Sequence, residues 1–288
     1  MRGGTMSSPR ILRFVRPFRS EDFFVVYLHR NAKGFSAING SPGKIVFLSP
    51  GTPLAAEGDD LHVTLSGFSQ MEEGVFLKPE DDEEECFLRV VRCSPASCEV
   101  EVLRSGFLTL SQKLLPLRPL SVGILTISDK GSRGERIDTA GPALEELVLD
   151  IGGIVRQRGI VPDERDMIAG TIKQWIDEDD CHLVLTTGGT GLATRDVTPE
   201  ALLSFASRVV PGIGEAMRAL TWQNAPRAIL TRGLAVTRGE SLIVSFPGSE
   251  RGARECFGAV APVLRHAVEI LRNWEKDCGS HTHHHSHA

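Results

Sequence analysis

The residues best suited to chemistry lie in one glycine-rich segment, Thr187-Gly188-Gly189-Thr190-Gly191. It follows an apolar stretch at 183–186 that has the length of a buried strand. Glycines at a strand end let the backbone approach a ligand closely, and their amides can bind an anion together with threonine hydroxyls. The segment therefore predicts a phosphate cradle. The alternative is a tight turn that serves only packing.

Two carboxylates are placed to act beside this cradle. Asp196 follows it shortly and could hold a divalent cation against bound phosphates; a salt bridge or a helix cap is its alternative. Asp163 follows a predicted strand at 154–161 and would face the same crevice in a parallel sheet. Its alternative is to cap the next helix. The pair would suit metal-assisted chemistry on a phosphate.

Other catalytic signatures are missing from the sequence. Thr194 stands where a dinucleotide fingerprint needs its third glycine, and no G-x-x-x-x-G-K-[ST] occurs. No Ser-His-Asp or Cys-His set is evident, and we interpret His182 and His266 as structural. The chain has 6 cysteines and no C-x-x-C pair, which favours a reducing compartment. Cys86, Cys93 and Cys98 cluster; we interpret them as core residues, with a metal site or a disulfide as alternatives.

The elements that must position these residues alternate between strand and helix. Strands are expected at 122–128, 154–161 and 183–186, with an edge hairpin at 234–238 and 241–246. Helices are expected from Pro142, from Asp163, from Thr198 to about residue 208, and from Ser249, the last kinked at Pro262. The pattern predicts a doubly wound, mainly parallel α/β sheet whose crevice lies at the carboxyl ends of its strands.

The first part of the chain differs in composition. Ten of the 13 Phe precede residue 119 and all 3 Trp follow it, so we place a boundary there. Short strands expected at 23–29, 44–49, 61–65, 74–78, 86–92 and 98–103 favour a small all-β barrel or sandwich. A run of carboxylates at 80–85 indicates an exposed loop, with a cation site as alternative. We predict three parts. Residues 1–119 form a first domain whose role the sequence does not indicate, residues 120–275 form a second domain, and residues 276–288 form a His-rich tail.

Composition excludes several classes. The chain has 288 residues, 41% of them hydrophobic, and a net charge of −5. It has no apolar run near the ~20 residues of a membrane helix, and Met1–Arg19 lacks the core of a secretory signal. The charge argues against broad nucleic-acid binding. We expect a cytoplasmic protein. The tail could bind nickel or zinc, or be a purification remnant or a disordered natural tail.

Residues 120 to about 272 resemble the MogA/MoaB family of molybdenum-cofactor biosynthesis, which is related to the G domain of gephyrin-type proteins. The matching motifs, in order, are Leu125-Thr126-Ile127-Ser128-Asp129, Asp138-Thr139-Ala140-Gly141-Pro142, Pro162-Asp163-Glu164, Leu185 to Gly191, Arg195 to Glu200, Pro211-Gly212-Ile213-Gly214-Glu215 and Phe246-Pro247-Gly248-Ser249. The resemblance does not extend to residues 1–119.

The resemblance implies a molybdopterin adenylyltransferase, which uses Mg-ATP to place AMP on the terminal phosphate of molybdopterin and releases pyrophosphate. It implies catalytic roles for Asp163, which would orient the reacting phosphate, and for Asp196, which would bind magnesium. It further implies substrate-binding roles for Ser128, Asp138, Thr139, Thr187, Gly188, Gly189, Thr190, Gly191, Gly212, Glu215, Ser245, Pro247, Gly248 and Ser249.

The sequence departs from the family at three positions. Ala140 stands where many relatives have Ser, and Ser245 where many have Asn, which could each weaken a ligand hydrogen bond by about 1 kcal/mol. Arg251 replaces a common Lys, which keeps the charge but changes its geometry. Activity is nevertheless the expectation.

Further expectations follow from the resemblance alone. The family implies a homotrimer and a molybdate-insertion enzyme as partner. The alternative to the enzyme is a non-catalytic pterin-binding or assembly module of the same fold, with the N-terminal barrel, of a MOSC-like type, handling the cofactor. A molybdate-insertion domain or a CinA-type pyrophosphatase is disfavoured by the intact T-G-G-T-G and R-D-V-T-P motifs.

Overall fold

The computed structural model describes residues 113–274 continuously and, before them, residues 10–14, 25–28, 35–36, 42–43, 45–48, 61–65, 72–79, 88–94, 97–103 and 106–109. The carboxylate run at 80–85, Cys86 and the His-rich tail lie outside these residues. The chain divides into two compact units: Met1–Pro119 with Val148–Ile154, and Leu120–Leu147 with Val155–Ala288. In the described part of the chain no helix combines the length and hydropathy needed to cross a membrane.

The described strands of the first unit form ladders that are mostly antiparallel. Seven pair in the order β1-β11-β7-β8-β9-β5-β6, and β6 pairs back to β1. The bounds are β1 Arg10–Phe14, β2 Val25–Leu28, β3 Phe35–Ser36, β4 Pro42–Gly43, β5 Ile45–Leu48, β6 Leu61–Leu65, β7 Phe76–Pro79, β8 Leu88–Cys93, β9 Ser97–Val102, β10 Gly106–Thr109 and β11 Lys113–Leu117. All six expected strands are present, and the β-rich character of the described part is confirmed.

One interpretation of the cysteines needs correction. Cys93 and Cys98 face each other across the β8–β9 ladder and are joined by a disulfide. The sequence favoured core roles for both, because spacing alone does not reveal that a hairpin brings them together. Cys181 and Cys256, in contrast, are buried free thiols of the second unit, and burial raises the pKa of each to about 11.

The second unit is an α/β sandwich built on one six-stranded sheet, in the order β13-β12-β14-β17-β16-β15. β12 pairs with β14, and β14 with β17, in parallel. The strands are β12 Leu120–Ile127, β13 Gly153–Val161, β14 Leu183–Thr187, β15 Arg208–Val209, β16 Ala235–Arg238 and β17 Ser241–Phe246. The helices are α1 Asp129–Ser132, α2 Ala140–Val148, α3 Arg165–Asp177, α4 Thr198–Leu203, α5 Pro211–Thr221 and α6 Glu250–Leu271, with the 3-10 turn η3 Pro226–Leu230. The 3-10 turn η2 Leu149–Ile151 lies in the segment that groups with the first unit.

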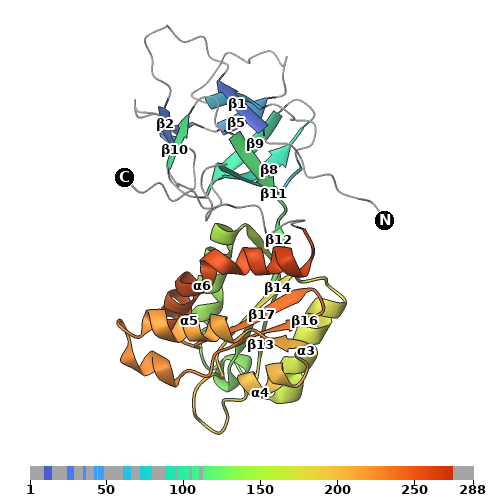
Figure 1. The fold of residues 1–288 in the computed structure, drawn as a ribbon, viewed down its shortest axis with the longest axis vertical. Coiled ribbons are helices and arrows are strands. Elements are labelled where there is room, and N and C mark those ends of the chain that lie inside the picture. The colour runs from blue at the N-terminus through green and yellow to red at the C-terminus, as the bar shows by residue number, and fades with distance from the viewer. Residues whose placement is uncertain are drawn as a thin grey trace, which may run out of the picture. The chain divides into compact units, whose positions relative to one another are not determined.

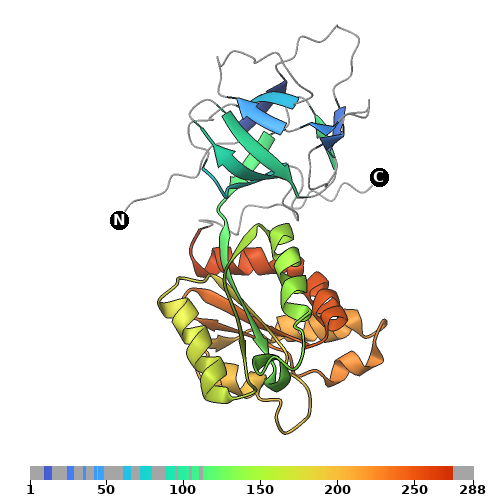
Figure 2. The ribbon, with the colours of Figure 1, turned by 180° about the vertical axis from the view of Figure 1, so that it is seen from behind.

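Helices cover both faces of this sheet, as the doubly wound prediction requires. Figures 1 and 2 show α3 and α4 on one face and α5 and α6 on the other. On the α3 face, Ile168, Ile172 and Trp175 pack against the strand residues Leu125 and Val184. The central strands are buried along nearly their whole length, which explains their continuous apolar sequences. The predicted mainly parallel α/β fold is confirmed.

Several local expectations were wrong. The N-cap of α3 is Glu164, not Asp163, and Thr198 is the first residue of α4 rather than its cap. The α4 helix ends at Leu203, and residues 208–209 instead add the strand β15 outside the hairpin, so the hairpin is not the sheet edge. Met167 is 48% exposed, although its helical spacing with Ile168, Ile172, Trp175 and Ile176 predicts a buried stripe that includes it. Ser249 does cap α6, and its hydroxyl accepts from the amide of Gly252.

Candidate active site

The candidate site lies where the strands of the parallel sheet end. Ser128 follows β12, Asp163 follows β13, the glycine cradle begins at the end of β14, and Pro247 follows β17. The parallel register makes these positions neighbours, so segments far apart in sequence meet at one edge of the sheet.

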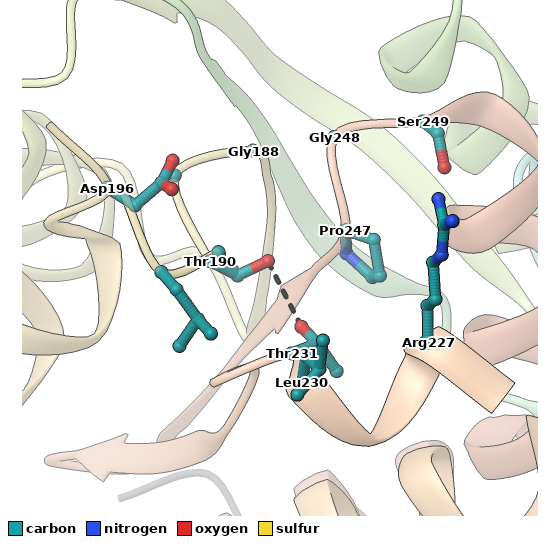
Figure 3. A pocket seen from close by; sticks show the side chains of 12 residues that line it. Gly188, Thr190, Asp196, Arg227, Leu230, Thr231, Pro247, Gly248 and Ser249 are labelled. Carbon is teal, nitrogen blue, oxygen red and sulfur yellow. Dashed lines mark hydrogen bonds between the residues drawn. The ribbon is translucent and has the colours of Figure 1, made fainter. Parts of the chain in front are cut away.

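Two cavities open at this edge. The larger, about 500 Å³, is lined by Gly188, Gly189, Thr190, Gly191, Leu192, Asp196, Arg227, Leu230, Thr231, Pro247, Gly248 and Ser249. Figure 3 shows Asp196 and Thr190 on one side of it and Arg227 and Ser249 on the other. The smaller, about 370 Å³, is lined by Thr126, Ile127, Ser128, Gly131, Arg136, Ile137, Asp138, Thr139, Asp163, Thr187, Gly188, Gly189, Asp196, Gly248 and Ser249.

The two cavities share one wall. Its members are Gly188, Gly189, Asp196, Gly248 and Ser249. The loops that carry them are joined by hydrogen bonds, since the amide of Gly188 donates to Phe246 O at 3.1 Å and the hydroxyl of Thr187 donates to Pro247 O at 2.7 Å. Ligands bound in the two cavities would therefore lie next to each other.

Close packing fixes the shape of the glycine cradle. Gly188 has a φ of +101°, and a Cβ there would overlap the carbonyl oxygen of Ile127. A Cβ on Gly248 would lie 3.1 Å from the Cα of Gly188. The hydroxyl of Thr198 donates to the carbonyl oxygen of Gly188 at 2.8 Å, which is why it does not cap α4. The three conditions leave room only for glycine at 188 and favour it at 248.

Asp163 is bound to the loop after β12 by two reciprocal hydrogen bonds. Its carboxylate accepts from the amide of Asp129 at 3.0 Å, and its own amide donates to the carboxylate of Asp129 at 3.1 Å. Arg195 reaches across from the segment after the cradle and donates twice to Asp129, at 2.7 and 3.0 Å. The hydrogen bonds from Arg195 lower the pKa of Asp129.

The negative charges that surround Asp163 would be neutralised by a cation bound near Asp163 and Asp196, the two carboxylates singled out from the sequence. Burial raises the pKa of Asp163, and the negative charges of Asp129 and Asp196 raise it further. Within the residues that the structure describes, no three His, Cys, Asp or Glu side chains form a metal cage. Magnesium binds through one or two carboxylates together with substrate phosphates and water, so Asp163 and Asp196 fit it in that mode.

Replacing Asp163 by asparagine is expected to stabilise the protein at pH 7. A carboxyl whose pKa is raised by folding binds protons more tightly in the folded state, so it costs stability once the pH exceeds its pKa. The group is partly exposed, so the gain should stay below about 1 kcal/mol. Thermal unfolding measures it. The gain should vanish well below the ordinary value of 3.8, and a gain of equal size at low pH would contradict this origin.

Asp138 has a structural task besides lining the smaller cavity. Its carboxylate accepts from the amides of Ala140 and Gly141 at 3.1 and 3.0 Å and from the hydroxyl of Thr126 at 2.8 Å. It therefore binds the first turn of α2 to β12. Ala140 contributes a backbone amide here, which a serine at this position would supply equally.

Most residues assigned from the sequence line the cavities, and three do not. Ser245 is fully buried, and its hydroxyl bonds to the amide and the carbonyl of Leu234, at 2.9 and 3.0 Å. Gly212 and Glu215 are exposed near the start of α5, outside the lining of both cavities. The structure thus brings together Ser128, Asp138, Thr139, Asp163, Thr187, Gly188, Gly189, Thr190, Gly191, Asp196, Pro247, Gly248 and Ser249.

The larger cavity also contains residues that the sequence analysis missed. Arg227, Leu230 and Thr231 come from η3 and the residue after it, and the hydroxyl of Thr231 donates to that of Thr190 at 3.2 Å. Arg227 is the basic residue of this lining. The sequence indicated these residues only weakly, because Pro226 suggests the start of a helical turn but the stretch around it has no apolar periodicity.

Fold and site together define an α/β protein with two adjoining cavities at the carboxyl ends of a parallel sheet. A family described as "Probable molybdopterin binding domain" matches residues 123–266. The chain belongs to this family, and the resemblance inferred from the motifs is confirmed.

Individual relatives agree with this assignment. A Helicobacter pylori protein named molybdopterin adenylyltransferase is 38% identical over 54% of this chain and 89% of its own length. A protein of the same name from Escherichia coli K12 is 41% identical over 50% of this chain and 75% of its own. A similar fold occurs in the crystal structure of the molybdopterin biosynthesis enzyme MoaB from Thermus thermophilus, with a TM-score of 0.52. The sequence of that protein is 47% identical over 54% of this chain and 97% of the MoaB chain.

Proposed function

We propose that residues 120–275 catalyse molybdopterin adenylylation, the transfer of AMP from Mg-ATP to the terminal phosphate of molybdopterin. The observation that carries the proposal is the wall shared by the two cavities. Group transfer between two substrates requires both to be held side by side, and adjacent cavities with a common polar wall meet that requirement. The names of relatives at 38–42% identity support the same reaction.

The lining residues suggest how the substrates are divided. The smaller cavity contains Asp138 and Asp163 and suits a nucleotide that carries magnesium, with Asp196 as the metal ligand in the shared wall. The larger cavity offers Arg227 to an anionic group and Leu230 to an apolar ring face, which suits a pterin with its phosphate. The cradle amides bind phosphate oxygens at the boundary.

The proposed chemistry needs no nucleophile from the protein. An oxygen of the pterin phosphate attacks the α-phosphorus of ATP; the new P–O bond forms as the bond from the α-phosphorus to the bridging oxygen breaks, and pyrophosphate leaves with that oxygen. Bound magnesium neutralises phosphate charge. Asp196 and the cradle position the reactants, while Asp163, held by Asp129 in the lining of the smaller cavity, orients the reacting phosphate.

The direct test is incubation of the full chain with molybdopterin and Mg-ATP. We expect adenylylated pterin and pyrophosphate in equal amounts, and neither product when magnesium is chelated. Pterin binding without either product would favour the second candidate, a pterin-binding or assembly module of the same fold.

We propose a cytoplasmic homotrimer, which sedimentation would test, and a molybdate-insertion enzyme as recipient of the product. For residues 1–119 we propose a role in cofactor handling. If deletion of these residues leaves turnover unchanged and they bind neither pterin nor molybdate when expressed alone, a scaffold role replaces it.

A further inference from the structure

Arg232 lies directly beside the glycine cradle, between η3 and β16. Its backbone amide donates to the carbonyl oxygen of Thr190 at 2.8 Å. Its Nε donates to the carbonyl oxygen of Gly191 at 2.7 Å. The residue therefore holds the last part of the cradle through both its main chain and its side chain.

The same guanidinium also holds the segment that follows the cradle. Nη2 donates to the carbonyl oxygen of Asp196 at 2.5 Å, and Nη1 pairs with the carboxylate of Glu200 in the first turn of α4. Residues 191 and 196 are the two ends of the loop that carries the candidate magnesium ligand. One side chain thus fixes both ends of this loop and joins them to a helix.

The carboxylate of Asp196 follows the backbone of this loop. It accepts a hydrogen bond from the amide of Ala193 at 2.8 Å, and the amide of Asp196 donates to Ala193 O at 2.9 Å. Both bonds lie inside the segment whose ends Arg232 holds. A shift of that segment would therefore move the carboxylate.

The chemistry of arginine suits this task better than that of lysine. A guanidinium presents five N–H groups in a rigid plane, so it can serve three acceptors in different directions at once. A lysine ammonium is a compact group that cannot span the same acceptors. Arg232 is about one-third exposed, at 32%, and lines neither cavity.

We propose that Arg232 is a positioning residue, which holds the loop 191–196 so that the carboxylate of Asp196 is in place for Mg-nucleotide. Its effects on turnover and on nucleotide binding rest on the proposed function. Its effect on the loop does not. Arg232 lies outside the lining of both cavities and acts through the main chain of the loop.

The test compares Arg232→Lys with Arg238→Lys. Both lysine variants keep the charge and the aliphatic stem. Arg238 is a matched control, because it is 30% exposed, binds Asp177 through two hydrogen bonds and lies at the other end of β16. The measurements are hydrogen exchange of the amides of Ala193 and Asp196, the Kd of a non-hydrolysable Mg-ATP analogue, the Kd of molybdopterin, and the magnesium concentration for half-maximal turnover.

We expect Arg232→Lys to accelerate exchange of both amides about tenfold and to weaken Mg-nucleotide binding about tenfold, the effect of losing charge-assisted hydrogen bonds. Half-maximal turnover should need about tenfold more magnesium, while the Kd of molybdopterin and the control variant stay within about twofold of the wild type. Glu200→Gln, which keeps the arginine but removes its ionised partner, should accelerate exchange of the same amides by a smaller factor.

The proposal would be overturned if the amides of Ala193 and Asp196 exchanged at the wild-type rate in both Arg232→Lys and Glu200→Gln. So would a loss of turnover with unchanged dependence on magnesium and unchanged nucleotide binding. If the wild-type protein binds both substrates but makes no product, the proposed function fails, and the exchange and nucleotide-binding measurements still decide the role of Arg232. If Arg232→Lys does not fold, exchange in Glu200→Gln decides it, and an unchanged rate there rejects the proposal.

Discussion

Replacing Asp196 by asparagine is expected to lower turnover about a thousandfold while leaving the Kd of molybdopterin nearly unchanged. Asparagine keeps the size of the side chain and can still accept the hydrogen bond from Ala193, so the loop should retain its shape. It removes the negative charge that binds magnesium, and charge neutralisation is the main demand of phosphoryl chemistry. Steady-state kinetics and pterin binding, measured on the same sample, check the prediction.

Asp177→Asn provides the control for this variant. Asp177 is an exposed carboxylate at the end of α3, paired with Arg238 and outside the lining of both cavities. It should keep full turnover. Full turnover in Asp196→Asn would remove the metal role, whereas loss of pterin binding in that variant would indicate that the carboxylate shapes the larger cavity instead.

The second large effect is expected at Gly188. Alanine there must adopt a φ of +101° and would place its Cβ on the carbonyl oxygen of Ile127, which is backbone and cannot rotate away. The strain of the left-handed conformation and the overlap should together cost about 3 kcal/mol and displace the cradle. Denaturant unfolding should show the loss of stability, and turnover should fall below detection.

Gly170→Ala tests whether this loss is specific. Gly170 lies on the exposed side of α3, and a Cβ there would meet no atom within 4 Å. Alanine in a helix is about 1 kcal/mol more favourable than glycine, so this variant should be more stable than the wild type and fully active. If Gly188→Ala were as stable as the wild type, the description of the cradle as closely packed would be wrong.

The extent to which sequence predicts this protein depends on how each residue acts. Continuous apolar strands such as β14 are readable because burial on both faces imposes their composition. The convergence of Asp163 and Asp196 at one edge followed from the parallel order of the strands. The short helix α1 was missed because its four residues contain a glycine and show no apolar period.

Interactions with main-chain carbonyls were beyond the reach of the sequence. Thr198 resembled a helix cap, but its hydroxyl bonds to the carbonyl oxygen of Gly188. Arg232 gave no signal, because two of the acceptors of its guanidinium are backbone oxygens, which every residue carries. The positions of Ser245, Gly212 and Glu215 were inferred from motif resemblance alone, which indicates proximity along the chain but not the direction of a side chain.

The contact between Gly188 and Gly248 has a consequence for evolution and engineering. A Cβ on Gly248 would lie 3.1 Å from the Cα of Gly188, so a larger residue there requires the Gly188 loop to move slightly, whereas a Cβ on Gly188 would overlap the carbonyl oxygen of Ile127. Position 188 is therefore expected to remain glycine among descendants of this gene, and a change at 248 is expected only together with a small shift of the Gly188 loop. Libraries that seek acceptors of new shape should keep both glycines and randomise Leu192 and Leu230, whose side chains are 68% and 54% exposed at the rim.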